Sequence, residues 1–185
     1  MPQNHFVNLL LTDFTTGYGH RLGKVVVERN LYSMAIDLAI EKQQLLMSAT
    51  NRHKVAFRAA YALEHAFFID IEYFMPYLHL ITSAFPKVKN RSVHRHFCKI
   101  ISTLLRTKRL DPTVEQASML AETAALWLSD PKSKVAVKVL SFDILCLLAP
   151  RVQWAAEIIP DAVGLLSNNP TPGIQVRLNQ SQGSI

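Results

Sequence analysis

The sequence repeats itself weakly about every 40 residues, and this repeat constrains the fold more than any other feature. The copies begin 38, 42 and 39 residues apart, at Val55, Val93, Val135 and Ile174. Each opens with a β-branched residue, and three positions later comes a basic or imidazole side chain: Arg58, His96, Lys138 and Arg177. A turn rich in Asn, Asp or Pro precedes each copy. Such a period is typical of supersecondary units that stack to bury a shared core.

Helix-period apolar patterns run through most of the chain, and no convincing alternating strand pattern appears. Glycine is scarce, with six residues, and the Asp-Pro pairs at 111–112 and 130–131 are typical helix starts. The glycine-rich stretch 17–23 follows no buried strand, so we expect a flexible connection between two helices. Turns short enough for antiparallel pairs separate the predicted helices. These cover residues 3–11, 20–29, 30–47, 52–68, 72–85, 90–107, 111–128, 130–149 and 152–166, with a short one up to about 178.

The repeat resembles HEAT repeats, a family of two-helix units that stack into a curved solenoid. The resemblance rests on the Val-x-x-Arg opening of the second helix and on a proline in the first, Pro76 or Pro160. It covers about residues 30–178 and implies an all-α fold, a right-handed α-α superhelix. The implied organisation is an N-terminal helical cap over 1–29, about four HEAT-like pairs over 30–178 and a flexible tail over 179–185.

A narrower resemblance lies in residues 120–141, which are similar to short HEAT-like proteins of Bacteroidetes-type bacteria. Several of those proteins carry the name adenylosuccinate lyase. Genuine lyases of that superfamily are more than twice this length and use a mobile Gly-Ser-Ser-x-Met-Pro loop with a catalytic serine. Met75 and Pro76 lack the preceding serines, so the residues favour a non-catalytic role.

The net charge of +6 is concentrated in one segment. Residues 87–109 hold eight of the 20 Lys and Arg residues and no acidic residue, whereas the rest of the chain is slightly acidic. Arg91, Arg95 and Lys99 share one helix face, and Arg106 continues close to it. This segment is either a contact surface for phosphate or an acidic protein, or simply a solvated helix face. The candidate binding surface comprises Lys87, Lys89, Arg91, Arg95, Lys99 and Arg106.

The four repeat-equivalent positions Arg58, His96, Lys138 and Arg177 form a second candidate set. One hypothesis makes them a row of positive groups along a groove. The other makes them a structural ladder, in which each side chain bonds to the turn or carbonyls of its neighbour. Asp143 lies in an apolar stretch, and we expect it to pair with Lys138 or Lys99.

Metal, cofactor and catalytic sites are not predicted. His94 and Cys98 share a helix face while His96 points away, and two ligands do not make a zinc site. Cys98 and Cys146 lie in apolar stretches and are expected to be inert. HEAT-like DNA alkylation repair glycosylases line a basic cleft with tryptophans and an aspartate, but Trp127 and Trp154 are expected to be packing residues.

The composition, 49% hydrophobic and 18% charged, is that of a chain able to bury a substantial core. No apolar run approaches the roughly 20 residues of a membrane span, no signal peptide is visible, and two cysteines are too few for a disulfide framework. We therefore predict a cytoplasmic protein without membrane association. The predicted function is a non-catalytic helical-repeat scaffold that binds a protein partner. The alternative is a nucleic-acid-binding protein of the DNA alkylation repair type, and the oligomeric state is left open.

Overall fold

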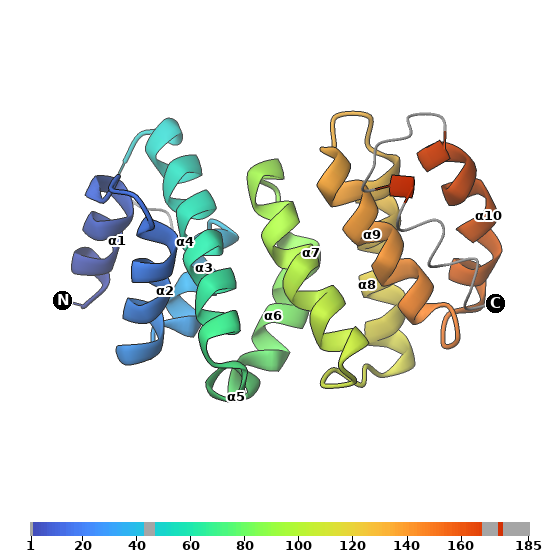
Figure 1. Cartoon of the computed structure of the whole chain (residues 1–185), viewed down its shortest axis with the longest axis horizontal. Coiled ribbons are helices and arrows are strands. Elements are labelled where there is room, and N and C mark those ends of the chain that lie inside the picture. The colour runs from blue at the N-terminus through green and yellow to red at the C-terminus, as the bar shows by residue number, and fades with distance from the viewer. Residues whose placement is uncertain (1, 43–46, 168–173, 176–185) are drawn as a thin grey trace. The chain divides into compact units, whose positions relative to one another are not determined.

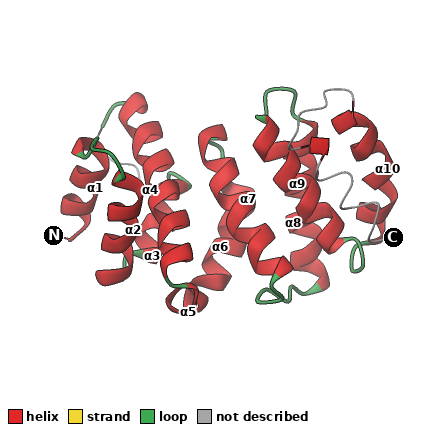
Figure 2. Cartoon of the chain, in the orientation of Figure 1, coloured by secondary structure: helices red, strands yellow, loops and turns green. Residues whose placement is uncertain are grey.

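The computed structural model describes residues 2–42, 47–167 and 174–175. Over these ranges every regular element is a helix, which confirms the predicted all-α class (Figure 1, Figure 2). None of the helices in the described part of the chain is long and apolar enough to cross a membrane. The elements are α1 (Pro2–Thr12), α2 (Tyr18–Glu28), α3 (Tyr32–Ala39), α4 (Ala49–Ile69), α5 (Ile71–Phe74), η1 (Met75–Tyr77), α6 (Leu78–Ala84), η2 (Phe85–Lys87), α7 (Arg91–Arg106), α8 (Val114–Ser129), α9 (Val135–Leu148) and α10 (Gln153–Ser167).

The chain divides into two compact units, residues 1–100 and 101–185. The predicted cap over 1–29 and the HEAT-like pairs over 30–178 stay predictions. The predicted tail over 179–185 lies outside the described residues.

In the first unit, α4 is the central helix, and α1, α2 and α3 all pack against it. Large aromatic side chains fill the core between these helices and the segment α5–α6, among them Phe6, Tyr32, Phe67, Phe74 and Phe85. The single helix predicted over 72–85 is interrupted at η1, a 3-10 turn that contains Pro76, and the second 3-10 turn, η2, contains Pro86 just after the predicted end. Proline cannot donate the backbone hydrogen bond that a continuous helix needs.

The glycines of α2 allow it to lie very close to α4. A Cβ atom on Gly19 would lie 2.4 Å from the Tyr61 ring, and one on Gly23 would lie 2.6 Å from the His65 Cβ. Gly17 has a left-handed φ of 75° and begins the helix. The prediction of a flexible connection over 17–23 was therefore wrong, because Gly19 and Gly23 lie within a packed helix.

In the second unit, α9 packs against both α8 and α10, and the core contains Leu120, Phe142 and Leu145. Helix α8 begins later than the Asp-Pro signal indicates, since Thr113 is its N-cap and forms a capping box with Gln116. Helix α9 likewise begins at Val135, after the predicted start at 130–131. The Asp130 side chain instead accepts a hydrogen bond from the Lys132 backbone N–H in the turn.

Candidate functional site

Basic residues of α7 meet a buried carboxylate, that of Glu64 on α4. The Lys99 Nζ lies 2.8 Å from Glu64 Oε1, and the Arg95 Nη1 lies 3.6 Å from Oε2. His96, from the same helix, donates its Nδ1 hydrogen to Oε2. Only 6% of the Glu64 side chain is exposed. Two residues of the predicted basic surface and one of the predicted ladder therefore converge on one acid.

The contacts around Glu64 decide its protonation state. Burial by itself would raise its pKa, but hydrogen bonds and charge interactions from His96 and Lys99 outweigh burial and lower the pKa to about 2. Glu64 is therefore ionised at neutral pH. The Lys99 ammonium also lies 4.8 Å from the centre of the Phe68 ring, a cation–π distance. This cluster joins α7 to α4.

The remaining residues of the predicted basic surface fall into two groups, one paired with a buried acid and one exposed. In the second unit, the Arg106 Nη2 lies 2.9 Å from Oδ2 of the buried Asp143 on α9. In the first unit, Lys87, Lys89 and Arg91 are exposed around the end of η2 and the start of α7. Arg95, Lys99 and Arg106 thus neutralise acids of neighbouring helices. The sequence predicted Lys138 or Lys99 as the partner of Asp143, and the structure pairs Asp143 with Arg106. The pairs of Glu64 were not predicted, because these residues are distant in sequence.

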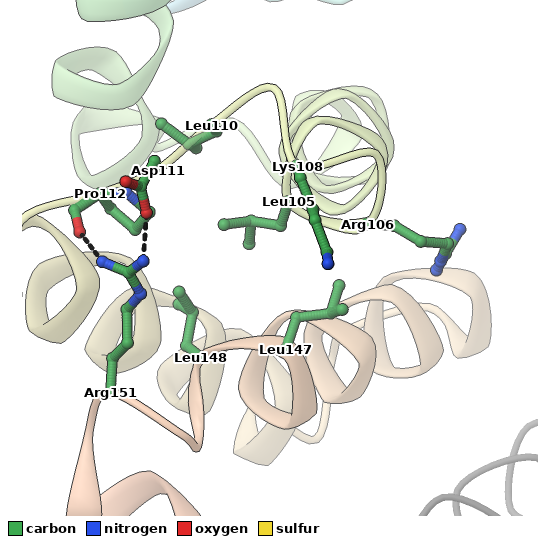
Figure 3. Close-up of a pocket in the computed structure, with 9 residues that line it drawn as sticks. All are labelled: Leu105, Arg106, Lys108, Leu110, Asp111, Pro112, Leu147, Leu148 and Arg151. Carbon is green, nitrogen blue, oxygen red and sulfur yellow. Dashed lines mark hydrogen bonds and ion pairs between the residues drawn. The ribbon is translucent and has the colours of Figure 1, made fainter.

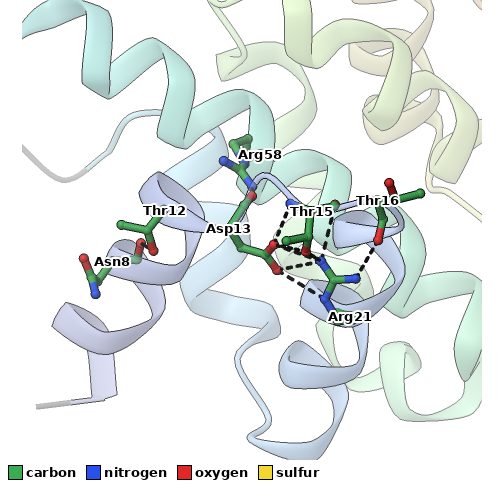
Figure 4. A network of polar contacts seen from close by, with 7 residues as sticks. All are labelled: Asn8, Thr12, Asp13, Thr15, Thr16, Arg21 and Arg58. Atoms are coloured by element: carbon green, nitrogen blue, oxygen red, sulfur yellow. Dashed lines mark hydrogen bonds and ion pairs between the residues drawn. The ribbon is translucent and has the colours of Figure 1, made fainter.

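Arg58, the first ladder residue, lies buried on α4 against the loop between α1 and α2 (Figure 4). It donates an Nη2 hydrogen to the carbonyl of Asp13. Its guanidinium carbon lies 4.8 Å from the centre of the Phe14 ring and 4.4 Å from that of Tyr18. Arg21 forms an ion pair of 2.8 Å with the Asp13 carboxylate and thereby holds the same loop.

The other ladder residues have different surroundings. His96 contacts a carboxylate, whereas Arg58 contacts a backbone carbonyl. Lys138 is half-buried on α9, and Arg177 lies outside the described residues. The repeat-equivalent positions that the structure describes therefore do not share one kind of contact.

The tryptophans and cysteines are buried or half-buried, as packing residues are. Trp127 is buried on α8, and Trp154 is half-buried on α10. Cys98 is buried and Cys146 half-buried, both as free thiols. Burial, helped by the nearby Asp143 charge, raises the pKa of Cys146 to about 11, so this thiol is protonated and unreactive at neutral pH.

The second unit contains a pocket of about 580 Å³ with apolar walls and a basic rim (Figure 3). It opens between the end of α7, the turn that follows, and the end of α9. Its apolar lining comes from Leu105, Leu110, Pro112, Leu147 and Leu148. Its charged lining comes from Arg106, Lys108, Asp111 and Arg151.

Arg151 fixes one wall of this pocket. Its Nη1 donates to the carbonyl of Pro112 at 2.8 Å, and its Nη2 pairs with the Asp111 carboxylate (Figure 3). Asp111 is itself 79% exposed on its side chain. These contacts tie the turn after α7 to the end of α9.

Lys108 lies on the pocket rim in a strained backbone conformation. Helix α7 ends in a Schellman motif, in which the Arg109 N–H donates to Leu104 O at 2.9 Å and the Lys108 N–H to Leu105 O at 3.0 Å. This motif places Lys108 in the left-handed region, with a φ of 55°. Glycine is the usual residue there, because a Cβ atom makes the conformation costly.

Two other non-glycine residues end helices in the same way. Asn30, with a φ of 52°, closes α2, and Glu41, with a φ of 55°, closes α3. Each side chain has an intramolecular partner, since Asn30 accepts from the Tyr77 hydroxyl at 2.6 Å and Glu41 lies 2.9 Å from His53.

Lys108 differs from both. Within residues 2–42, 47–167 and 174–175 its ammonium makes no hydrogen bond or ion pair, and Figure 3 shows it extending toward Leu147. A lysine held at a position that favours glycine, with its charge over an apolar pocket, is the strongest indication of a binding site in this unit.

The charged lining of the pocket consists of three basic residues and one acidic residue. Its one carboxylate, Asp111, is paired with Arg151, and its lining contains no serine, cysteine or histidine. No group of three or more His, Cys, Asp or Glu residues in the described part of the chain could hold a metal ion. Comparisons with known proteins add nothing further, since no family profile, curated protein or solved structure matches the chain.

Proposed function

We propose that the protein is a non-catalytic helical-repeat protein of the HEAT type that binds an acidic segment of a protein partner in the leucine-lined pocket. The observation that carries this proposal is Lys108, whose ammonium lies over apolar walls without an intramolecular partner among the described residues. The leucine walls suit an apolar anchor residue of the partner, and the basic rim suits carboxylates beside that anchor.

The lining favours a protein partner over nucleic acid. Single-stranded nucleic acids gain much of their binding energy from bases stacked on aromatic side chains. The nine residues that line this pocket include no aromatic residue. Four leucines and a proline form an apolar surface that a peptide side chain would fill.

The proposal is tested by selection from a phage-displayed library of short random peptides against the immobilised full chain. Enriched peptides should combine a leucine, isoleucine or phenylalanine with flanking aspartate or glutamate. Their affinity, measured by fluorescence anisotropy, should fall at least about tenfold for Lys108→Glu, since a favourable charge contact becomes a repulsive one.

Lys132→Glu is the matched control, because it makes the same charge change at an exposed lysine in the turn before α9. It should leave the affinity within about twofold, as expected for a charge outside the interface. Selected peptides that bind Lys108→Glu and the wild type equally would contradict the proposal. If a labelled DNA duplex bound the wild type but not Lys108→Glu, the pocket would be assigned to nucleic acid instead.

A further inference from the structure

Three phenylalanine or tyrosine side chains in the described part of the first unit are exposed, namely Phe14, Phe68 and Tyr73. Exposed aromatic rings on an ordered backbone are typical of binding surfaces. The charges around these rings differ. Tyr73 has acidic surroundings, because Glu72 precedes it and the Asp70 carboxylate accepts its backbone N–H. Phe14 and Phe68 instead lie against cations.

The cations that contact Phe14 make no ion pair with an acid in the described part of the chain. The Lys54 Nζ lies 4.2 Å from the centre of the Phe14 ring, and the guanidinium carbon of Arg58 lies 4.8 Å from it. Lys99 lies at a similar distance from the Phe68 ring, but the buried glutamate of α4 neutralises it at 2.8 Å. A negatively charged ligand therefore gains more at Phe14 than at Phe68.

Two arginines hold the loop that carries Phe14 in place (Figure 4). Arg58 donates an Nη2 hydrogen to the carbonyl of Asp13, and Arg21 pairs with the Asp13 carboxylate at 2.8 Å. The acid next to Phe14 in sequence is thereby neutralised. The Nε and Nη1 atoms of Arg58 are buried and have no hydrogen-bond partner among the described residues. The positive charge of Arg58 is therefore not compensated by an acid of the unit.

The positive surface continues from Phe14 to the start of α7. Asn90 donates from its Nδ2 to the carbonyl of His53 at 3.2 Å, and this contact joins the starts of α4 and α7 (Figure 1). Lys54 follows His53 in the chain, and the exposed Lys89 precedes Asn90. Neither helix has an acidic residue in its first turn. The partial positive charge of each helix N-terminus therefore adds to the charge of the lysines.

The lysines of this surface outnumber the acid that lies among them. Glu41 contacts the His53 Nδ1 at 2.9 Å. Lys54, Lys87 and Lys89 make no ion pair with any of the described residues. We call the set Phe14, Lys54, Lys87 and Lys89 the basic edge. It includes two residues of the basic surface that the sequence predicts.

An exposed ring beside unpaired cations is typical of sites for single-stranded nucleic acid. At such sites the bases stack on aromatic side chains while Lys and Arg contact the phosphates. In a duplex the bases already stack on one another, so the Phe14 ring would add little. Insertion into a bilayer needs a ring that projects from the surface, whereas Phe14 lies against two cations of α4.

We propose that the basic edge binds single-stranded nucleic acid, with a base stacked on Phe14 and neighbouring phosphates on Lys54 and Lys89. The proposal does not depend on the acidic-segment pocket, because that pocket lies in the second unit and takes a different ligand. Either proposal can therefore fail while the other holds.

The test uses a fluorescein-labelled oligonucleotide of about fifteen thymidines, a length that covers the usual site sizes. It should bind the full chain saturably in fluorescence anisotropy. An oligonucleotide of the same length with abasic sites should bind at least about fivefold more weakly, because it keeps the phosphates and loses the stacking. Lys89→Ala should weaken binding and lower the slope of log affinity against log salt by about one.

Phe14→Leu tests the ring itself, because leucine still covers Arg58 but cannot stack on a base. It should weaken binding at least about fivefold, whereas Phe14→Trp should bind at least as tightly as the wild type. Phe68→Leu is the matched control, since Phe68 is exposed in the same unit beside a neutralised lysine. It should change the affinity less than about twofold.

Circular dichroism should show wild-type helix content for all of these variants, because the replaced side chains are exposed. Absence of saturable binding, equal binding of the abasic oligonucleotide, or an unchanged affinity of Phe14→Leu would overturn the proposal. Binding to phosphatidylserine vesicles without binding to the oligonucleotide would assign the basic edge to membranes instead.

Discussion

Replacing Lys108 by glycine separates the backbone conformation at this position from the role of the side chain. The φ of 55° places Lys108 in the left-handed region, which costs an ordinary L-residue about 1–2 kcal/mol. Glycine avoids that cost but loses about 0.5–1 kcal/mol through its more flexible unfolded state. The difference predicts that Lys108→Gly raises the free energy of unfolding by about 0.5–1 kcal/mol.

Lys108→Ala is the control for the conformational part, because alanine keeps the Cβ atom and its cost. Its free energy of unfolding should stay within about 0.5 kcal/mol of the wild-type value. Both variants should bind the selected acidic peptides about five- to tenfold more weakly, since both lack the ammonium group. Urea unfolding followed by circular dichroism gives the stabilities, and fluorescence anisotropy gives the affinities.

Two results would refute this reasoning. If Lys108→Gly were less stable than the wild type, α7 would not end in the left-handed conformation. If Lys108→Gly were more stable and bound the peptides with unchanged affinity, the lysine would have no role in binding.

Further predictions concern the helix contacts of each unit. Glu64→Gln should lower the free energy of unfolding, measured by urea titration, by about 2–3 kcal/mol, because it leaves the cations around the buried site uncompensated. In the same titration Asp111→Asn should change the free energy of unfolding by less than about 0.5 kcal/mol, because Asp111 is mostly exposed. Because the pKa of Glu64 is lowered from 4.5 to about 2 in the folded state, its contribution is present above pH 4.5 and is lost as the pH falls toward 2. Unfolding free energies measured across that range should fall less steeply for Glu64→Gln, and equal slopes would contradict the assignment. Gly23→Ala should destabilise the first unit by about 1–3 kcal/mol, since the new Cβ would lie 2.6 Å from the His65 Cβ and 3.0 Å from the Ala66 nitrogen. At Gly164 an added Cβ would meet no atom within 4 Å, so Gly164→Ala should instead stabilise α10 by about 0.5–1 kcal/mol. Thermal unfolding should therefore show a lower Tm for Gly23→Ala and a higher Tm for Gly164→Ala than for the wild type.

The helical periodicity was sufficient to predict most helices, because it reports directly which side chains face the core. Helix α7 was predicted over 90–107 and spans Arg91–Arg106. Helix ends were harder to predict. The stop signals at Asn30, Glu41 and Lys108 lack the glycine that usually marks a left-handed end.

The starts of α8 and α9 show how local signals can mislead. Asp111 is engaged by Arg151, a residue distant in sequence, and the capping role passes to Thr113. Asp130 bonds within its own turn and does not cap α9. In both places the aspartate oxygen has another hydrogen-bond donor, so the Asp-Pro pair does not begin the helix.

The candidate site could be predicted from sequence only in part. The basic segment 87–109 was recognised from composition, and it includes both Arg106 and Lys108 of the pocket. The leucines of α9 and Arg151 join them only through tertiary packing, which periodicity does not reveal. For the same reason Glu64 was not predicted as a partner of this segment, and Asp143 was assigned to Lys138 or Lys99 although the structure pairs it with Arg106.

Methyl NMR of the leucine-labelled full chain tests the proposed pocket most directly. On titration with an acidic peptide selected against the wild type, we expect the methyl signals of Leu105, Leu110, Leu147 and Leu148 to shift together and to saturate. Leu63 and Leu22, buried in the first unit, should keep their positions. Saturable binding with these four leucines unmoved would contradict the assignment of the pocket as the binding site.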